Sequence, residues 1–355
     1  MRVGILTSGG DCQALNATMR GLALTLYRNV KDAEIIGFID GYKGLMYEKY
    51  RKMKPKDFYD ILNVGGSILG NSRCPFKRMR IIENGFDKVK AMKNTYKKLE
   101  LDCLVVLGGN GSIKSANMLS QEGLNVIALP KTIDNDAWGT DYTFGYSSAT
   151  AIATRYLDEI KTTAASHSRV FVIEVMGHKV GHICLSAGIA AGADVILLPE
   201  IPYDIKVVAK KVKETLKDEK NYAIIACAEG AISEADALMK RKDYKAKVLA
   251  RNGRSVAYEV ADELSQEIDA EIRVSCIGHA QRGGHPDSYD REISTRFGVE
   301  GARLIIKKHY GEYVVLQGNH VTHIPLEATA GKLKYVDTEG EIVQSAKLVG
   351  ISFGE

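Results

Sequence analysis

The chain has 355 residues, of which 45% are hydrophobic and 26% charged, a composition typical of a folded globular protein. It excludes a disordered, collagen-like or low-complexity chain. The formal net charge is only +4, from 48 basic and 44 acidic side chains, which argues against a nucleic-acid-binding protein.

Short, continuously apolar runs alternate with longer amphipathic segments along the chain. The apolar runs predict strands at residues 3–6, 34–38, 104–107, 126–129, 170–175, 195–198, 223–228, 272–277 and 313–316. The amphipathic segments predict helices at residues 15–27, 87–97, 112–120, 149–160, 207–216, 255–268 and 293–307. This alternation indicates parallel sheets with helices on both faces, and there are too many strands for one typical sheet. We therefore expect an α/β fold with two doubly wound (Rossmann-like), three-layer domains.

Several features predict a cytoplasmic protein. The longest apolar stretch, residues 183–198, contains Asp194 and is shorter than the about 20 residues that span a membrane. No leader with a basic and an apolar region precedes the first predicted strand. The six cysteines include no C-x-x-C pair and are typical of buried, free thiols in a reducing compartment.

Three glycine-rich loops, at residues 7–11, 65–73 and 108–112, predict phosphate binding. Two of them join a predicted strand to a predicted helix, where glycine lets the backbone approach a ligand and the helix amino terminus attracts phosphate. The chain has neither a G-x-x-x-x-G-K-[ST] motif nor a G-x-G-x-x-G motif after a strand. A P-loop nucleoside triphosphatase and a nicotinamide-dependent oxidoreductase are therefore disfavoured alternatives.

A fourth loop, Pro-Lys-Thr-Ile-Asp-Asn-Asp at residues 130–136, follows another predicted strand. Asp134 and Asp136 stand two residues apart, so one carboxylate can accept a proton from an attacking hydroxyl while the other holds Mg²⁺. Further along, His178 and His182 have the i, i+4 spacing of metal ligands on a helix, which we consider a minor alternative.

Together these segments resemble the phosphofructokinase family. The matching segments lie in the family's order over nearly the whole chain, at residues 6–11, 65–73, 108–112, 130–136, 166–169, 174–177 and 278–284. The resemblance implies transfer of a phosphoryl group from ATP to the 1-hydroxyl of fructose 6-phosphate, a glycolytic reaction, with the active site in the cleft between two domains. It implies a donor-binding (ATP and Mg²⁺) domain of residues 1–145 plus 281–330 and a fructose 6-phosphate-binding domain of residues 146–280 plus 331–355.

The resemblance also implies a role for individual residues. Asp134 would be the general base, Thr132 would position substrate and transferred phosphate, and Asp136 would bind Mg²⁺, with Asn110 where the family usually has an aspartate linked to the metal. Residues implied at the donor site are Gly9, Tyr42, Arg73, Cys74, Gly109, Gly111 and Ser112. Residues implied at the sugar-phosphate site are Arg169, Met176, Gly177, His178, Glu229, Arg273, His279 and Arg282.

The resemblance places Arg169 and Arg273 at the 6-phosphate of a neighbouring subunit. It therefore implies a homodimer or homotetramer with shared active sites.

Departures from the family pattern leave the phosphoryl donor open. Lys131 is typical of pyrophosphate-dependent members and of some ATP-dependent ones, and it can partly replace the cationic role of the metal. Gly111 stands where pyrophosphate enzymes often carry aspartate, whose bulk and charge would exclude the α-phosphate of ATP. His178 replaces a usual arginine. We expect an ATP-dependent enzyme; the alternatives are a pyrophosphate-dependent phosphotransferase and a weakly active regulatory subunit.

Overall fold

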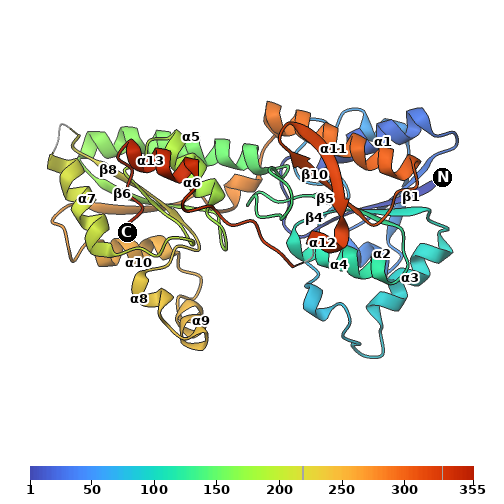
Figure 1. Ribbon diagram of the computed structural model, residues 1–355, viewed down its shortest axis with the longest axis horizontal. Helices are drawn as coiled ribbons and strands as arrows, with labels where there is room; N and C mark the ends of the chain where they lie inside the picture. Colours follow the sequence, from blue (N-terminus) through green and yellow to red (C-terminus); the bar gives the residue numbers. More distant parts are fainter. Residues whose placement is uncertain (218–219, 330) are drawn as a thin grey trace. The chain divides into compact units, whose positions relative to one another are not determined.

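The computed structural model describes residues 1–217, 220–329 and 331–355. It divides into two compact units, one of Met1–Ser148 with Arg282–Lys334 and one of Ala149–Gln281 with Tyr335–Glu355. In each unit, helices cover both faces of a β-sheet (Figure 1). The expected α/β fold with two doubly wound domains is confirmed.

The first unit is built on a seven-stranded sheet with the strand order β11-β10-β5-β4-β1-β2-β3. β1, β2, β4, β5 and β10 pair in parallel, whereas β3 and β11 are antiparallel strands at the two edges. The bounds are β1 Arg2–Ser8, β2 Glu34–Phe38, β3 Tyr50–Met53, β4 Cys103–Gly108, β5 Val126–Pro130, β10 Glu312–Gln317 and β11 His320–Pro325.

Helices α1 (Leu15–Asn29) and α11 (Ser288–Ile306) pack against each other on one face of this sheet (Figure 1). Gly21 and Gly298 allow the close approach, since a Cβ atom on either glycine would overlap the backbone of the other helix. On the other face lie α2 (Tyr42–Met46), α3 (Lys88–Lys98), α4 (Asn110–Gln121) and α12 (Leu326–Thr329). Their apolar side chains form a buried core with the strands.

The second unit contains a fully parallel four-stranded sheet with the order β7-β8-β6-β9. The bounds are β6 Val170–Val175, β7 Val195–Leu197, β8 Ala223–Ala228 and β9 Ile272–Cys276. One face carries α5 (Tyr146–His167), α6 (His182–Ala190) and α13 (Glu341–Leu348); the other carries α7 (Ile205–Lys217) and α10 (Val256–Leu264) (Figure 1). Between β8 and α10, helices α8 (Glu234–Ala237) and α9 (Arg241–Ala250) extend away from the sheet.

Two expectations from the sequence concern membrane spans and thiols. Within the described ranges, every helix is too short or too polar to cross a bilayer. All six cysteines are free thiols. Four of them are buried as expected, but Cys276 is exposed and Cys74 is only partly covered.

Candidate active site

Three of the four predicted loops meet at one edge of the first unit's sheet. β1, β4 and β5 are parallel neighbours, so the loops after them emerge at the same carboxyl edge. The amide of Lys131 donates to the carbonyl of Gly108 at 3.2 Å, which joins the β5 loop to the β4 loop. The ammonium group of Lys131 donates to the carbonyl of Gly10 in the β1 loop. Lys131 therefore contacts both glycine loops.

Two cationic groups face the β1 loop. The Lys131 side chain is buried, and this burial lowers the pKa of Lys131, while the carboxylates of Asp11 and Asp136 oppose the shift. The guanidinium group of Arg282, which the resemblance implied at the sugar-phosphate site, lies directly against Gly10 of the β1 loop, where a Cβ atom would overlap it. Two cations beside a glycine loop suit the phosphate groups of a ligand.

The β1 loop requires glycine at residue 9. Gly9 has a φ of +93°, and a Cβ atom there would lie 3.4 Å from Lys131 Nζ and 3.5 Å from Ser112 Oγ. A side chain would thus be strained and would fill the space in front of both polar groups. The absence of a side chain leaves this space open to a ligand.

Thr132 and Asp134 share one tight turn at the end of β5. The Asp134 amide donates to Thr132 Oγ1 at 3.1 Å, and Thr143 Oγ1 donates to the Thr132 carbonyl at 2.7 Å. Asn135 takes a left-handed conformation with a φ of +53°. Both predicted catalytic side chains are half-buried. The turn thus holds the Thr132 hydroxyl group and the Asp134 carboxylate in fixed positions relative to each other.

The two predicted metal ligands are both contacted by the segment Gly331–Lys334. Asn110 Nδ2 donates to the carbonyl of Lys332 at 2.6 Å, and the amide of Lys334 donates to the carbonyl of Asp136 at 2.9 Å. The ammonium group of Lys332 lies 5.4 Å from the ring centroid of Trp138. The amide of Asn110 is thus used as a hydrogen-bond donor, which an aspartate could not provide.

The segment that carries Arg73 and Cys74 is a neighbour of the β1 loop. A cavity of about 230 Å³ lies beside this segment. Both of these predicted donor-site residues line it, together with Lys43, Tyr47 and Met79. Tyr42 itself is fully buried, and its hydroxyl donates to the Ser112 carbonyl at 2.8 Å. It therefore supports the amino-terminal turn of α4 from beneath.

Sequence reasoning selected Tyr42 and missed Lys43 in the same helix and Tyr47 directly after it. The short helix α2 offers too little periodicity to tell its buried face from its exposed one.

In the second unit, a group of predicted residues meets at the carboxyl ends of β6 and β8. The amide of Glu229 donates to the Val175 carbonyl at 2.9 Å, and the amide of Gly230 donates to the Gly177 carbonyl at 3.1 Å. These bonds bring Glu229 beside the loop of Met176, Gly177 and His178. Gln281 Oε1 accepts a hydrogen bond from the Met176 amide at 3.3 Å, which ties the 3₁₀ helix Gly278–Arg282, with exposed His279, to the same strand end.

Arg169 and Arg273 lie at the opposite end of these strands. Both guanidinium groups pair with Glu271, Arg169 at 2.8 Å. Arg169 precedes the first residue of β6, whereas Met176 follows the last. At about 3.3 Å per residue, this separates them by roughly 20 Å along the strand. Within one chain, the structure does not bring the two arginines together with Met176 and Glu229.

A cavity of about 750 Å³ opens at the carboxyl end of the second sheet. His178 and Glu229 line it, and so does Glu174, which lies in the matching segment 174–177 without an implied role. Arg241 and Lys245 also line it, and sequence reasoning missed them. Arg241 and Lys245 belong to α9, whose polar composition gave no sequence signal for a site.

The alternative of a helical metal site at His178 and His182 is wrong. His182 is the first residue of α6, and His178 lies in the preceding loop, so the two are not on one helix. Over the ranges that the structure describes, no three His, Cys, Asp or Glu side chains gather in a way that could hold a metal ion.

Comparisons with known proteins agree with this geometry. Residues 2–305 match the family described as phosphofructokinase. The chain is 47% identical to the ATP-dependent 6-phosphofructokinase of Spirochaeta thermophila, over 99% of this chain and 97% of that protein. It is 42% identical to ATP-dependent 6-phosphofructokinase 3 of Bacteroides thetaiotaomicron, over the full length of both.

Among solved structures, phosphofructokinase from Saccharomyces cerevisiae matches with a TM-score of 0.80 and 28% identity, over 93% of this chain and 45% of that one. Pyrophosphate-dependent phosphofructokinase from Marinobacter aquaeolei matches with a TM-score of 0.80 at 17% identity, which shows the fold alone. With most of its length matched by the family and by full-length relatives, the chain belongs to the phosphofructokinase family.

Proposed function

We propose that the chain is an ATP-dependent 6-phosphofructokinase, which transfers the γ-phosphoryl group of ATP to the 1-hydroxyl of fructose 6-phosphate. The observation that carries this proposal is the meeting of two glycine loops and the loop of residues 130–136 at one sheet edge, in a chain 47% identical to a relative of that name. Phosphoryl transfer depends mainly on positioning and on charge stabilisation. Lys131 and Arg282 supply positive charge at the β1 loop, where phosphate groups of the donor would lie.

Asp134 acts as the general base in this proposal. Its carboxylate accepts the proton of the 1-hydroxyl as that oxygen attacks the γ-phosphorus, and the bond to the β-phosphate oxygen breaks. Thr132, whose Oγ1 accepts from the Asp134 amide, orients the substrate and the transferred phosphate. Lys131 stabilises negative charge on the donor phosphates.

The donor set at the β4 and β5 loops fits Mg²⁺ that arrives with the nucleotide. Mg²⁺ is commonly held by one or two carboxylates together with substrate phosphates. Asp136 offers a carboxylate, and the Nδ2–Lys332 bond of Asn110 leaves its Oδ1 for a metal or its water. When bound, the ion would neutralise charge on the β- and γ-phosphate oxygens.

The space around Gly111 supports ATP as the donor. No atom lies within 4 Å of a Cβ atom placed on Gly111, so the backbone there is open. The case for the alternative donor, pyrophosphate, depends on Lys131, a residue typical of pyrophosphate-dependent members of the family.

We assign donor binding to the first unit and sugar-phosphate binding to the second. The distance between Arg169 and Met176 along β6 supports a homo-oligomer, a dimer or tetramer, in which both arginines serve the active site of a neighbouring copy. Six free thiols support a reducing compartment, the cytoplasm.

A coupled assay for fructose 1,6-bisphosphate tests the proposal. The purified chain is given fructose 6-phosphate and Mg²⁺ with either ATP or pyrophosphate. We expect turnover with ATP and little with pyrophosphate. Turnover with pyrophosphate alone would contradict the donor assignment, and no turnover with either donor would favour a regulatory subunit.

A further inference from the structure

The cavity of about 750 Å³ in the second unit is lined by further residues besides those predicted for the sugar-phosphate site. One side carries the predicted residues His178 and Glu229, at the ends of β6 and β8. The other side is one face of α9. Arg241, Tyr244, Lys245 and Val248 all line the cavity, and their spacing of three, four and seven residues places them on one face of this helix.

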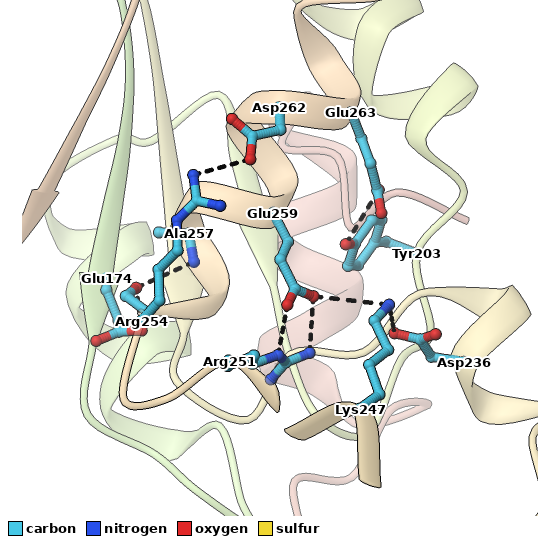
Figure 2. A network of polar contacts seen from close by, with 11 residues as sticks. Glu174, Tyr203, Asp236, Lys247, Arg251, Arg254, Ala257, Glu259, Asp262 and Glu263 are labelled. Carbon is cyan, nitrogen blue, oxygen red and sulfur yellow. Dashed lines mark hydrogen bonds and ion pairs between the residues drawn. The ribbon is translucent and has the colours of Figure 1, made fainter. Parts of the chain in front are cut away.

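Two other cations of the α8–α10 region, Lys247 and Arg251, hold α9 in place. Figure 2 shows Lys247 and Arg251 converging on Glu259 of α10. Arg251 makes two hydrogen bonds to Glu259, at 2.6 and 2.8 Å, and Lys247 also pairs with the buried carboxylate of Asp236 at 2.6 Å. Because these pairs are largely shielded from water, they fix α9 and its cavity-lining face against α10.

Arg241 and Lys245 differ from these cations. Both are exposed, and among the described residues neither has an ion pair. They stand one helical turn apart on the fixed face of α9, so two positive charges are directed to the same cavity. Nothing in the described structure neutralises them.

The two sides of the cavity thus offer different chemistry. Cationic lining side chains are Lys179, Arg241, Lys245, Arg251 and Arg254, whereas the carboxylates are Glu174 and Glu229. Glu174 already accepts a hydrogen bond from the Ser255 hydroxyl. A carboxylate such as Glu229 binds sugar hydroxyls, and unpaired lysine and arginine bind a phosphate group. The combination suits a phosphorylated sugar.

We propose that Arg241 and Lys245, from the same chain that carries Glu229, recognise the phosphate group of the sugar-phosphate substrate alongside Arg169 and Arg273 of a neighbouring copy. This inference rests on the proposed function and adds two specificity-determining residues to it. The side chains act on binding, and neither takes part in the transfer step.

Kinetics of the double variant Arg241→Gln/Lys245→Gln test this inference. Loss of two charge-assisted contacts should raise the KM for fructose 6-phosphate by about tenfold or more. The kcat and the KM for ATP should stay within about twofold, because both residues lie outside the transfer chemistry. Direct calorimetric titration with fructose 6-phosphate should show the same loss of affinity.

Two matched variants separate this role from a structural one. Lys242→Gln removes a charge from an exposed residue of α9 that does not line the cavity, and it should leave the KM unchanged. The double variant Arg241→Lys/Lys245→Arg keeps both charges and should keep most of the affinity. An unchanged KM in the Gln double variant, with an active wild type, would overturn this inference alone. An inactive wild type that does not bind fructose 6-phosphate would overturn the proposed function as well.

Discussion

Gly111 illustrates how a single residue controls access to the donor loops. It is the second residue of α4, with open space around its Cα and an ordinary helical φ. A side chain is therefore tolerated by the backbone, and its effect depends on the ligand. An acidic side chain near a helix amino terminus also does not weaken the helix.

Substitution of Gly111 tests donor choice at this scale. The variant Gly111→Asp should lower kcat/KM for ATP by about tenfold or more, since the carboxylate repels the nucleotide phosphates, and should leave the KM for fructose 6-phosphate unchanged. The neutral variant Gly111→Ala separates charge from bulk and should remain close to wild type. Equal losses in both variants would mean that bulk, not charge, limits the space.

At the scale of elements, helix α11 is joined to the segment after the catalytic loop through Asp290. This buried carboxylate accepts hydrogen bonds from the Gly145 amide at 2.9 Å, the Ser148 amide at 2.8 Å and the Ser148 hydroxyl at 2.5 Å. Burial raises the pKa of Asp290 to about 6, and the three hydrogen bonds only partly oppose this. The folded protein therefore holds a proton there at a higher pH than the unfolded chain does.

The titration of Asp290 predicts a stability change with pH. Between about pH 4 and 6 the folded state binds the additional proton, so the free energy of unfolding falls as pH rises through this window. Relative to the variant Asp290→Asn, which cannot titrate, the wild type should lose on the order of 3 kcal/mol. Urea unfolding of both proteins from pH 4 to 7 measures the difference. Parallel stability curves would show that Asp290 is not responsible.

Elements differ in how well the sequence predicted them. Central strands such as β4 and β8 are continuously apolar and buried, so their composition alone identified them. The edge strands β3 and β11 were missed, because three of the four residues of β3 are exposed and β11 mixes polar with apolar residues, none of them buried. Both form through antiparallel hydrogen bonds to a neighbouring strand, which local composition does not encode. Helix α9 was missed for a similar reason, since ion pairs to α8 and α10 hold it.

At the scale of the whole molecule, the separation of Arg169 from Met176 predicts active sites shared between copies. We expect Asp134→Asn and Arg169→Ala each to be nearly inactive alone. A mixed dimer of the two variants contains one site with both wild-type residues, so coexpression should restore roughly a quarter of wild-type activity by random pairing. As the control, each single variant is expressed alone at the same level and its activity is measured. A mixture as inactive as its components would show that one chain builds each site alone.

The sequence by itself determined the order of strands, helices and loops, and with it the family. Apolar runs and the Pro-Lys-Thr-Ile-Asp-Asn-Asp motif at residues 130–136 are local features, which can be recognised without a structure. Tertiary structure alone decided which side chains meet. Lys131 reaches the carbonyl of Gly10, which lies 121 residues away in the chain, and Asn110 donates to Lys332, 222 residues away. Such contacts depend on which strands are neighbours and on where each loop leaves the sheet. The ion pairs of Lys247 and Arg251 with Glu259 of α10 likewise turn Arg241 and Lys245 toward a cavity, which no local pattern specifies.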